Sequence, residues 1–461
     1  RREPSVLIPS HAPDRSEKPA MDAGEGLPSS PAMSADQTTL RWLANPYGLL
    51  DECSDALGDT FTLQFTRFGT HVVLSDPRDV REVMTADVSL MLAGRGNSLL
   101  EPVLGAGSLL LVDGDRHASL RVLLQGALRA ERVAACALTA TQATERHTRH
   151  WKDGEVVGIQ ETALAISREV VLRMTLGVDV AECERIGVMV REWMKLIATN
   201  AAFDEPSESA LHRRFAQARR ALDDELQDHV ARRSRDPACR REPQDLLSIL
   251  VDARRQGFVL DDDEIRDQLV TMILAGHETT ASSIAWAMLC IHDAPHARCR
   301  LLEELDAPGQ RTGELGVFLQ AVCMETLRLR PVVPVVSRQL ARPWRLRGRI
   351  LPADLFVTPC AYLSHRRADV FSDPNDFRPE RFLEHRYSPY EYFPFGGGAR
   401  RCIGMGLAMT EMQVVLAGLL RRFTFTPAAS KPVRPVRRAV TIVPSGGARM
   451  RIQRRQPAAE S

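Results

Sequence analysis

A single cysteine near the end of the chain, Cys402, has neighbours whose types and spacing could do chemistry. The stretch FPFGGGARRCIG, at 393–404, places three consecutive glycines and two arginines directly before this cysteine. An apolar helical pattern, MGLAMTEMQVVLAGLL, follows it. The first turn of a helix offers unpaired backbone N–H groups and the positive end of the helix dipole, and both favour an anion. The sequence therefore predicts that Cys402 is held as a thiolate, with a pKa below that of an ordinary thiol.

The glycines around Cys402 indicate what the thiolate could bind. Gly396, Gly397 and Gly398 allow a tight turn that passes close to something flat and bulky, and Gly404 does the same on the far side. A rigid thiolate whose neighbouring backbone stays clear is suited to be an axial ligand of haem iron. The chain has nine cysteines and no CxxC pair, so we expect the other eight to be buried and inert. A nucleophilic cysteine is the alternative, but no histidine has a clear role as its base.

The hexapeptide AGHETT, at 275–280, lies in the middle of a long helical pattern. Thr279 can donate a hydrogen bond to the carbonyl of Ala275, and Gly276 relaxes the backbone, so the helix could open there and leave room for a small ligand. Glu278 and Thr279 form an acid–alcohol pair that could relay protons during dioxygen activation. The structural alternative is a threonine that caps its own helix and a glutamate in a buried salt bridge.

Two more stretches, ETLR at 325–328 and FRPERF at 377–382, lie between these motifs. Glu325 and Arg328 share a helix face, and a buried ion pair needs more hydrogen bonds than one partner supplies. Together with the pattern Phe395-x-x-Gly398-x-Arg400-x-Cys402-x-Gly404, the motifs resemble those of the cytochrome P450 monooxygenases. The resemblance extends over about residues 45–450 and implies the cytochrome P450 fold with a bound haem b.

The resemblance also implies roles for individual residues. It makes Cys402 the metal ligand and Glu278 with Thr279 the catalytic pair, while Arg381 joins Glu325 and Arg328 in a structural trio. Contacts with the haem are implied for Phe395, Gly398, Gly404, Ala275 and Gly276. It places His117, Arg121, Arg338 and Arg400 at the haem propionates, with a one-residue offset at Arg338, and the alternative for each is a solvated surface cation.

The segments that line the substrate cavity in this family fall on 91–109, 197–209, 275–279, 332–336 and the region of Ile442. The candidate pocket residues are therefore Val332, Val333, Val335, Ala275 and Ile442. These segments are largely apolar, which suits a lipid-like or terpenoid substrate. The valines could equally belong to an ordinary β core. Overall, the sequence is similar to bacterial members that oxidise terpenoids, fatty acids or steroids.

The chain shows no dinucleotide fingerprint and no reductase domain, so we expect electrons from a separate protein. The expected donor is a ferredoxin or flavodoxin with an NAD(P)H-dependent reductase. A basic patch of Arg400, Arg401, Arg421 and Arg422 could face this acidic donor, although such arginines are often plain surface. Two alternatives stay open, a peroxygenase that uses hydrogen peroxide directly and a haem protein that binds gas without turnover.

The elements that must position these residues are mostly helical. The periodicity predicts helices at 116–135, 161–176, 188–202, 210–233 and 265–292, a β-hairpin at 61–74 with Asp76 as the next helix cap, and a loop at 203–209. The longest pattern would span about 40 Å and should cross the centre of the molecule. The sequence predicts a mainly α fold with a small β portion, comprising a disordered tail at 1–38, one domain at 39–455 and a flexible tail at 456–461.

The composition fits an ordinary globular protein. The 461 residues carry a net charge of +1, with 44% hydrophobic and 26% charged residues, so no global field favours nucleic acid or an anionic membrane. The N-terminal stretch lacks an apolar signal region, and His277 and Glu278 interrupt the one long apolar helix. We expect a cytoplasmic protein that acts as a monomer without a membrane span.

Overall fold

The computed structural model describes residues 26–126, 128, 130–199, 209–235, 245–307, 315–428 and 432–455. The predicted C-terminal tail and residues 200–208 of the predicted cavity lining lie outside this part. Of the predicted N-terminal tail, residues 26–38 are described. Helix α1, Ala35–Ala44, already begins there, with a capping box between Ser34 and Gln37. Among the described residues, no helix is long and apolar enough to cross a membrane.

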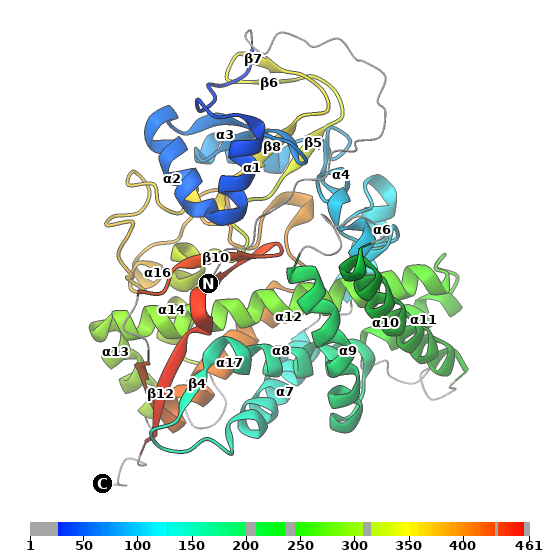
Figure 1. The fold of residues 1–461 in the computed structure, drawn as a ribbon, viewed down its shortest axis with the longest axis vertical. Coiled ribbons are helices and arrows are strands. Elements are labelled where there is room, and N and C mark those ends of the chain that lie inside the picture. The colour runs from blue at the N-terminus through cyan, green and yellow to red at the C-terminus, as the bar shows by residue number, and fades with distance from the viewer. Residues whose placement is uncertain are drawn as a thin grey trace.

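The fold is mainly helical with small sheets, as predicted (Figure 1). The remaining helices are α2 Pro46–Leu57, α3 Pro77–Thr85, α4 Ala93–Gly96, α5 Glu101–Leu104, α6 Gly114–Gly126, α7 Ala130–Thr148, α8 Ile159–Leu176, α9 Val180–Ala198, α10 Ala210–Arg235, α11 Leu246–Arg255, α12 Asp262–Asp293, α13 Pro295–Asp306, α14 Val317–Leu329, α15 Ala361–Ser364, α16 Arg381–Glu384 and α17 Met405–Arg422. The strands are β1 Thr60–Phe65, β2 Gly69–Leu74, β3 Met91–Leu92, β4 Val156–Gly158, β5 Arg338–Leu340, β6 Trp344–Leu346, β7 Arg349–Leu351, β8 Phe356–Pro359, β9 Phe423–Pro427, β10 Pro435–Arg438, β11 Thr441–Pro444 and β12 Arg449–Arg454.

The largest sheet has the order β1-β2-β8-β5-β3 and lies with α1, α2 and α3 at one end of the molecule (Figure 1). The predicted hairpin is confirmed, because β1 and β2 pair antiparallel in the register Thr60 to Leu74. The side chain of Asp76 caps α3 by accepting a hydrogen bond from the N–H of Arg78, also as predicted. The sequence thus specifies this end of the fold through short-range signals.

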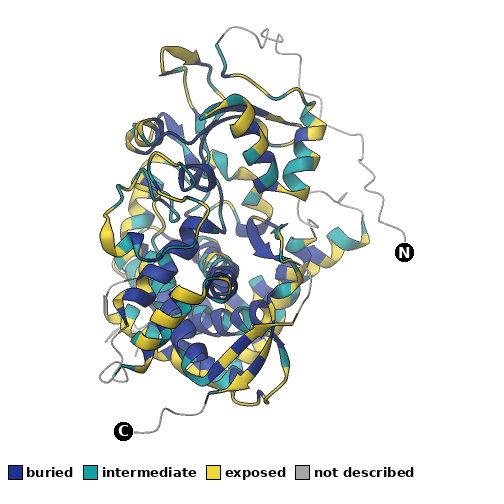
Figure 2. Cartoon of the chain, turned by 90° about the vertical axis from the view of Figure 1, so that its left-hand side faces the viewer, coloured by how far each residue is buried: buried dark blue, intermediate teal, exposed yellow. Residues whose placement is uncertain are grey.

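Helix α12 crosses the helical half and organises its core. Its 32 residues span about 48 Å, and its first turn is fixed by a capping box between Asp261 and Glu264. Most of its side chains are buried, and it packs against α8, α10 and α17. Buried residues gather in these inner helices, while the outer faces of the peripheral helices are exposed (Figure 2). The predicted central helix is confirmed and slightly extended.

Two helix predictions need correction. The pattern at 116–135 suggested one helix, but α6 ends at Gly126 and α7 starts at Ala130, since glycine costs helix stability and permits a break. The helix predicted at 188–202 begins earlier, at Val180, where the side chain of Asp179 accepts from the N–H of Glu182. Its first turns carry Glu182, Glu184 and Arg185, which interrupt the apolar pattern before Val188. Residues 203–208 of the predicted loop lie outside the described chain.

Candidate active site

The loop before Cys402 is held by its own backbone. The N–H of Cys402 donates to the carbonyl of Phe395 across 2.9 Å, and the N–H of Arg401 donates to Gly398 across 3.1 Å. Gly396 and Gly398 have φ values of +65° and +63°, in the left-handed region that side chains avoid. Helix α17 starts at Met405, so the thiol lies just ahead of the helix.

Two of the glycines make room for the protein itself. A Cβ atom at Gly397 would lie 2.1 Å from Sδ of Met84, and one at Gly398 would lie 2.0 Å from the carbonyl oxygen of Met84. The close passage at these two positions is therefore to helix α3. At Gly404 a Cβ atom would be 3.9 Å from Sγ of Cys402, which is an ordinary contact.

Cys402 keeps free surface although the surrounding chain desolvates its thiol. Cys402 is exposed, yet burial raises the pKa of its thiol, against a smaller lowering by the N–H of Gly404 and by Arg121 and Arg401. The predicted lowering of the Cys402 pKa is therefore wrong for the polypeptide without a bound group. Desolvation of the thiolate raises the pKa more than the backbone N–H and the arginines lower it. Of the other described cysteines, only Cys299 is exposed.

The middle of α12 also leaves surface free. Ala275 is exposed in the middle of a mostly buried helix, and the hydroxyl of Thr279 donates to its carbonyl across 2.7 Å, as predicted. The helix stays continuous here, so the predicted opening of its hydrogen-bond ladder is not observed. Gly276 serves close packing instead, because a Cβ atom there would lie 3.0 Å from a methyl group of Val171 on α8.

Glu278 follows Ala275 by three residues on α12 and is 4% exposed. Its Oε1 is 2.9 Å from Nε of Arg438, which makes an ion pair without the alignment of a hydrogen bond. Burial raises the pKa of the Glu278 carboxyl to about 7, although Arg438 and the Thr441 hydroxyl act to lower it. A carboxyl of this kind is partly ionised near neutral pH, which suits proton exchange.

The four predicted basic residues line one hollow of about 250 Å³, together with Asp113. Arg121 donates to the carbonyl of Arg401 across 2.7 Å, and Arg338 donates to that of Ser337 across 2.9 Å. Arg400 forms an ion pair with Asp113. The structure therefore brings together cations from α6, β5 and the loop before α17.

The residues that line this hollow carry a net positive charge, because three arginines face the one carboxylate of Asp113. Burial, followed by Arg400 and Arg121, lowers the pKa of His117 to about 4, and burial with Arg400 lowers that of Arg338 to about 10. Asp113 is the only acidic residue among the described residues that line the hollow. Such a group of cations fits a guest that carries carboxylates.

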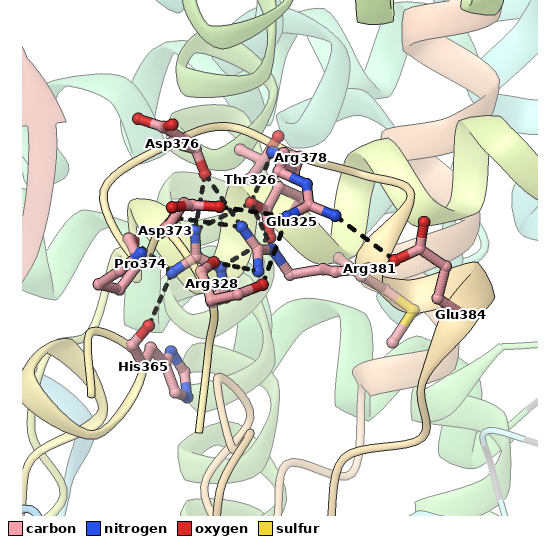
Figure 3. Close-up of polar contacts among 12 residues, drawn as sticks. Glu325, Thr326, Arg328, His365, Asp373, Pro374, Asp376, Arg378, Arg381 and Glu384 are labelled. Carbon is pink, nitrogen blue, oxygen red and sulfur yellow. Dashed lines mark hydrogen bonds and ion pairs between the residues drawn. The ribbon is translucent and has the colours of Figure 1, made fainter. Parts of the chain in front are cut away.

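The structure assembles the predicted trio of Glu325, Arg328 and Arg381 (Figure 3). Nε of Arg328 lies 2.7 Å from Oε2 of Glu325, and Nε of Arg381 lies 3.0 Å from Oε1. All three side chains are at most 2% exposed. Nη2 of Arg328 donates to Oε1 of Glu325 across 2.8 Å as a third donor, and the N–H of Arg378 adds a fourth, also across 2.8 Å.

The trio also fixes the loop between α15 and α16. Both guanidinium groups donate to carbonyl oxygens of this region, and the bonds of Arg328 to His365 and Pro374 are each 2.7 Å long. Arg381 donates to the carbonyl of Ser372 across 2.8 Å. Because every donor finds an acceptor, the buried charges are satisfied and the chain leading toward Cys402 is held in one course.

Comparisons with known proteins decide the family. The family model described as Cytochrome P450 matches residues 38–449. Cytochrome P450 135B1 of Mycobacterium tuberculosis is 33% identical over 438 residues, covering 93% of this chain and 92% of the relative. Cytochrome P450 137 of the same species is 31% identical, covering 96% and 93%. The chain belongs to the cytochrome P450 family.

Solved structures show the same fold. A cyanobacterial CYP120A1 with bound retinoic acid superposes with a TM-score of 0.81 at 22% identity, covering 94% of this chain and 100% of that one. The haem domain of cytochrome P450DA gives a TM-score of 0.80 at 19% identity, covering 94% and 99%. As a P450, the chain is a haem-thiolate monooxygenase, and the family generally takes electrons from redox partners.

The residues of this P450 fit a haem. Among the described residues, no three His, Cys, Asp or Glu side chains gather where they could hold a metal ion. A porphyrin supplies four nitrogens and two carboxylates. The free thiol surface and the crowded cations match these needs.

The predicted substrate pocket of the P450 needs one correction. Ile442 is 2% exposed, packs in a core cluster with Tyr47, and accepts a hydrogen bond from Trp286 through its carbonyl, so its side chain has almost no surface for a ligand. Val332 is also buried, and its carbonyl accepts from the N–H of Ile442. Val333 and Val335 are half-buried, and Val335 forms an isolated β-bridge with Cys360.

The predicted basic patch on the P450 does not assemble. Arg421 and Arg422 end α17, roughly 25 Å along the helix from Arg401. Arg422 donates to the hydroxyl of Thr148 and lies over Phe423. Arg400 is turned inward to Asp113. Of the four arginines of the predicted patch, only Arg401 is exposed.

Two contacts in the P450 site were missed. They are the ion pair of Asp113 with Arg400 and the ion pair of Arg438 with Glu278. The partners of both, Arg400 and Glu278, are remote in sequence, and a single sequence carries no signal for such pairs.

Proposed function

We propose that this P450 activates dioxygen with electrons from a separate ferredoxin or flavodoxin and its NAD(P)H-dependent reductase. It then hydroxylates or epoxidises a hydrophobic small molecule. The observation that carries the proposal is the Cys402 thiol, which keeps free surface deep inside the fold. A cytoplasmic setting belongs to the same proposal, supported by described cysteines that are all unpaired.

In this proposal the sulfur of Cys402 would hold the iron of a haem b. His117, Arg121, Arg338 and Arg400 would hold the propionates, which would relieve the mutual repulsion of the three arginines, while the neutral His117 would donate a hydrogen bond. Phe395, Gly398, Gly404, Ala275 and Gly276 border the porphyrin. When bound, the haem supplies the activation of dioxygen, favoured by electron density from the thiolate.

The chain's own task is to deliver protons and exclude water. Thr279 offers its hydroxyl beside the exposed face of Ala275, and its present bond to the Ala275 carbonyl fixes the oxygen there. Glu278 is its neighbour in the chain and titrates near neutral pH. The pair can therefore pass protons to an acceptor next to Thr279.

The proposed substrate is a terpenoid, fatty acid, steroid or related natural product. The candidate lining, Ala275, Val332, Val333 and Val335, is apolar and carries no charge. The CYP120A1 structure that shares this fold holds retinoic acid, a molecule of the same general character. A peroxygenase is disfavoured because Glu278 and Thr279 are retained, and proton relay matters most when the oxidant is dioxygen.

A substrate screen tests this function. Purified haem-loaded protein is mixed with terpenes, fatty acids and steroids, and the iron spin state is followed by absorption. Compounds that shift it are then tested with NAD(P)H and a ferredoxin–reductase pair, or with peroxide alone. We expect oxygenated product with the redox pair. Product with peroxide alone would favour the peroxygenase, and gas binding without any product would favour a sensor or carrier.

A further inference from the structure

The tip of the β10–β11 hairpin brings a charged side chain to Glu278. Arg438 and Thr441 are paired at the end of the hairpin register, and both lie next to the Glu278 carboxyl. The side chain of Glu278 is 5% exposed, whereas that of Arg438 is 31% exposed. Arg438 therefore spans from the buried carboxyl to the outside.

The hairpin tip is held in a strained conformation. Ala439 has a φ of +50°, which costs a residue with a Cβ atom roughly 1 kcal/mol. Ala439 is 6% exposed and packs into the core cluster that includes Ile273 of α12. A backbone outlier fixed by packing in this way places its neighbour Arg438 at one defined position beside α12.

The ion pair leaves the carboxyl free to exchange a proton. Oε1 of Glu278 is 2.9 Å from Arg438 but has no aligned hydrogen-bond donor among the described residues. The Thr441 hydroxyl has one proton to share between this carboxyl and the carbonyl of Arg438, which it meets at 3.0 Å. A purely structural salt bridge would satisfy both carboxyl oxygens, as Glu325 does.

Other ionisable groups near Glu278 do not compete with it. Burial and then Arg168 of α8 lower the pKa of His277 to about 3, so this imidazole stays neutral, and its Nε2 lies 3.1 Å from the Leu164 carbonyl. Arg168 is a permanent cation. Glu278 is thus the group in this neighbourhood that changes its charge near neutral pH.

We propose that Arg438 is a positioning residue for Glu278, holding its carboxyl on the hairpin side of α12 where it can bind a proton from outside and release it toward Thr279. This inference rests on the proposed function. The step transfers one proton and no electrons. A hydronium ion at the exposed edge of Arg438 gives its proton to the carboxylate and leaves as water, and the carboxyl later passes that proton to an acceptor beside Thr279, while Arg438 stays charged throughout.

The test uses haem-loaded protein with Arg438→Gln, Arg438→Met and Arg438→Lys. Arg437→Gln removes the same charge from the adjacent position, whose side chain points to the other face of the strand. The quantity measured is product formed per NAD(P)H consumed, as a function of pH. Loss of the cation should move the optimum upward by about 1 to 3 pH units, while Arg438→Lys and the Arg437→Gln control keep the original optimum.

A second readout does not depend on turnover. The infrared band of the protonated Glu278 carboxyl, assigned by its loss in Glu278→Gln, should persist to higher pH in Arg438→Gln and Arg438→Met. Superimposable titrations of these variants and the parent would overturn the proposal. If the parent forms no product at all, the proposed function fails, and the infrared titration still decides the role of Arg438.

Discussion

Glu411 on α17 and Ser167 on α8 form a buried hydrogen bond between the helix that follows Cys402 and the helix that packs along α12. Their side chains belong to residues that are 4% and 0% exposed. Burial raises the pKa of Glu411 to about 7, and Cys136 on α7 faces it without adding a cation. The carboxyl is therefore protonated in the folded protein below neutral pH.

This pair predicts a pH-dependent stability. The folded pKa is above the unfolded value, so the contribution of Glu411 is fully present below about pH 4.5 and is lost as pH rises through about 7. The loss should approach ~3 kcal/mol in the free energy of unfolding. Glu411→Gln should remove it, as urea unfolding at several pH values would measure. The exposed Glu161→Gln on α8 is the control, and an unchanged pH dependence in Glu411→Gln would refute the assignment.

Removing one partner of the trio should be severe. Arg381→Ala leaves the buried Glu325 carboxylate short of a donor, and we expect a loss of about 3–5 kcal/mol or no folded protein. Arg378→Ala in the same loop is the matched control, since its side chain is 37% exposed and pairs only with surface acids. That variant should lose at most ~1 kcal/mol. Equal losses from the two substitutions would contradict the buried network.

Alanine substitutions at Gly397 and Gly398 should both destabilise the protein, but only the first should be compensated by a second substitution. A Cβ atom at Gly397 meets the end of the Met84 side chain, so Gly397→Ala should destabilise the protein and Met84→Ala should restore part of the loss. At Gly398 the obstacle is the Met84 carbonyl oxygen and φ is +63°, so no side-chain change should help Gly398→Ala. Thermal unfolding of the single and double variants measures both effects. Rescue of Gly398→Ala by Met84→Ala would show that this geometry is wrong.

Arg338, one of the cations that line the hollow of about 250 Å³, should affect the stability of the haem-free protein and the retention of haem in opposite directions. Arg338→Gln relieves repulsion in the haem-free protein, so its stability should stay equal or rise. Haem should dissociate faster by about 10-fold to 100-fold, because a charge-assisted hydrogen bond worth roughly 1.5–3 kcal/mol is lost. Transfer of haem to an apoglobin measures the rate, with the exposed Arg345→Gln as control. Unaltered haem loss would remove Arg338 from the propionate site.

The sequence predicts best where the signals are local. The cap at Asp76, the hairpin at 61–74 and the bond from Thr279 to Ala275 each depend on residues a few positions apart. The central helix could be predicted because its apolar pattern is long. The family motifs supplied the trio, whose members are remote from one another.

Contacts set by the packing of distant segments could not be predicted. The pairing of Arg438 with Glu278, the burial of Ile442 and the separation of Arg401 from Arg422 all follow from how helices and hairpins meet. The pKa of Cys402 belongs to the same class, because its direction depends on desolvation that only the folded chain imposes.

The central claim is that the sulfur of Cys402 binds haem iron, and the absorption spectrum of the reduced carbonyl complex tests it most directly. The parent protein and Cys299→Ser, which changes the other cysteine that is exposed among the described residues, should both show the thiolate-type Soret band. Cys402→Ser should lose it. A thiolate-type band that survives in Cys402→Ser, or that is absent from the haem-loaded parent, would contradict the account.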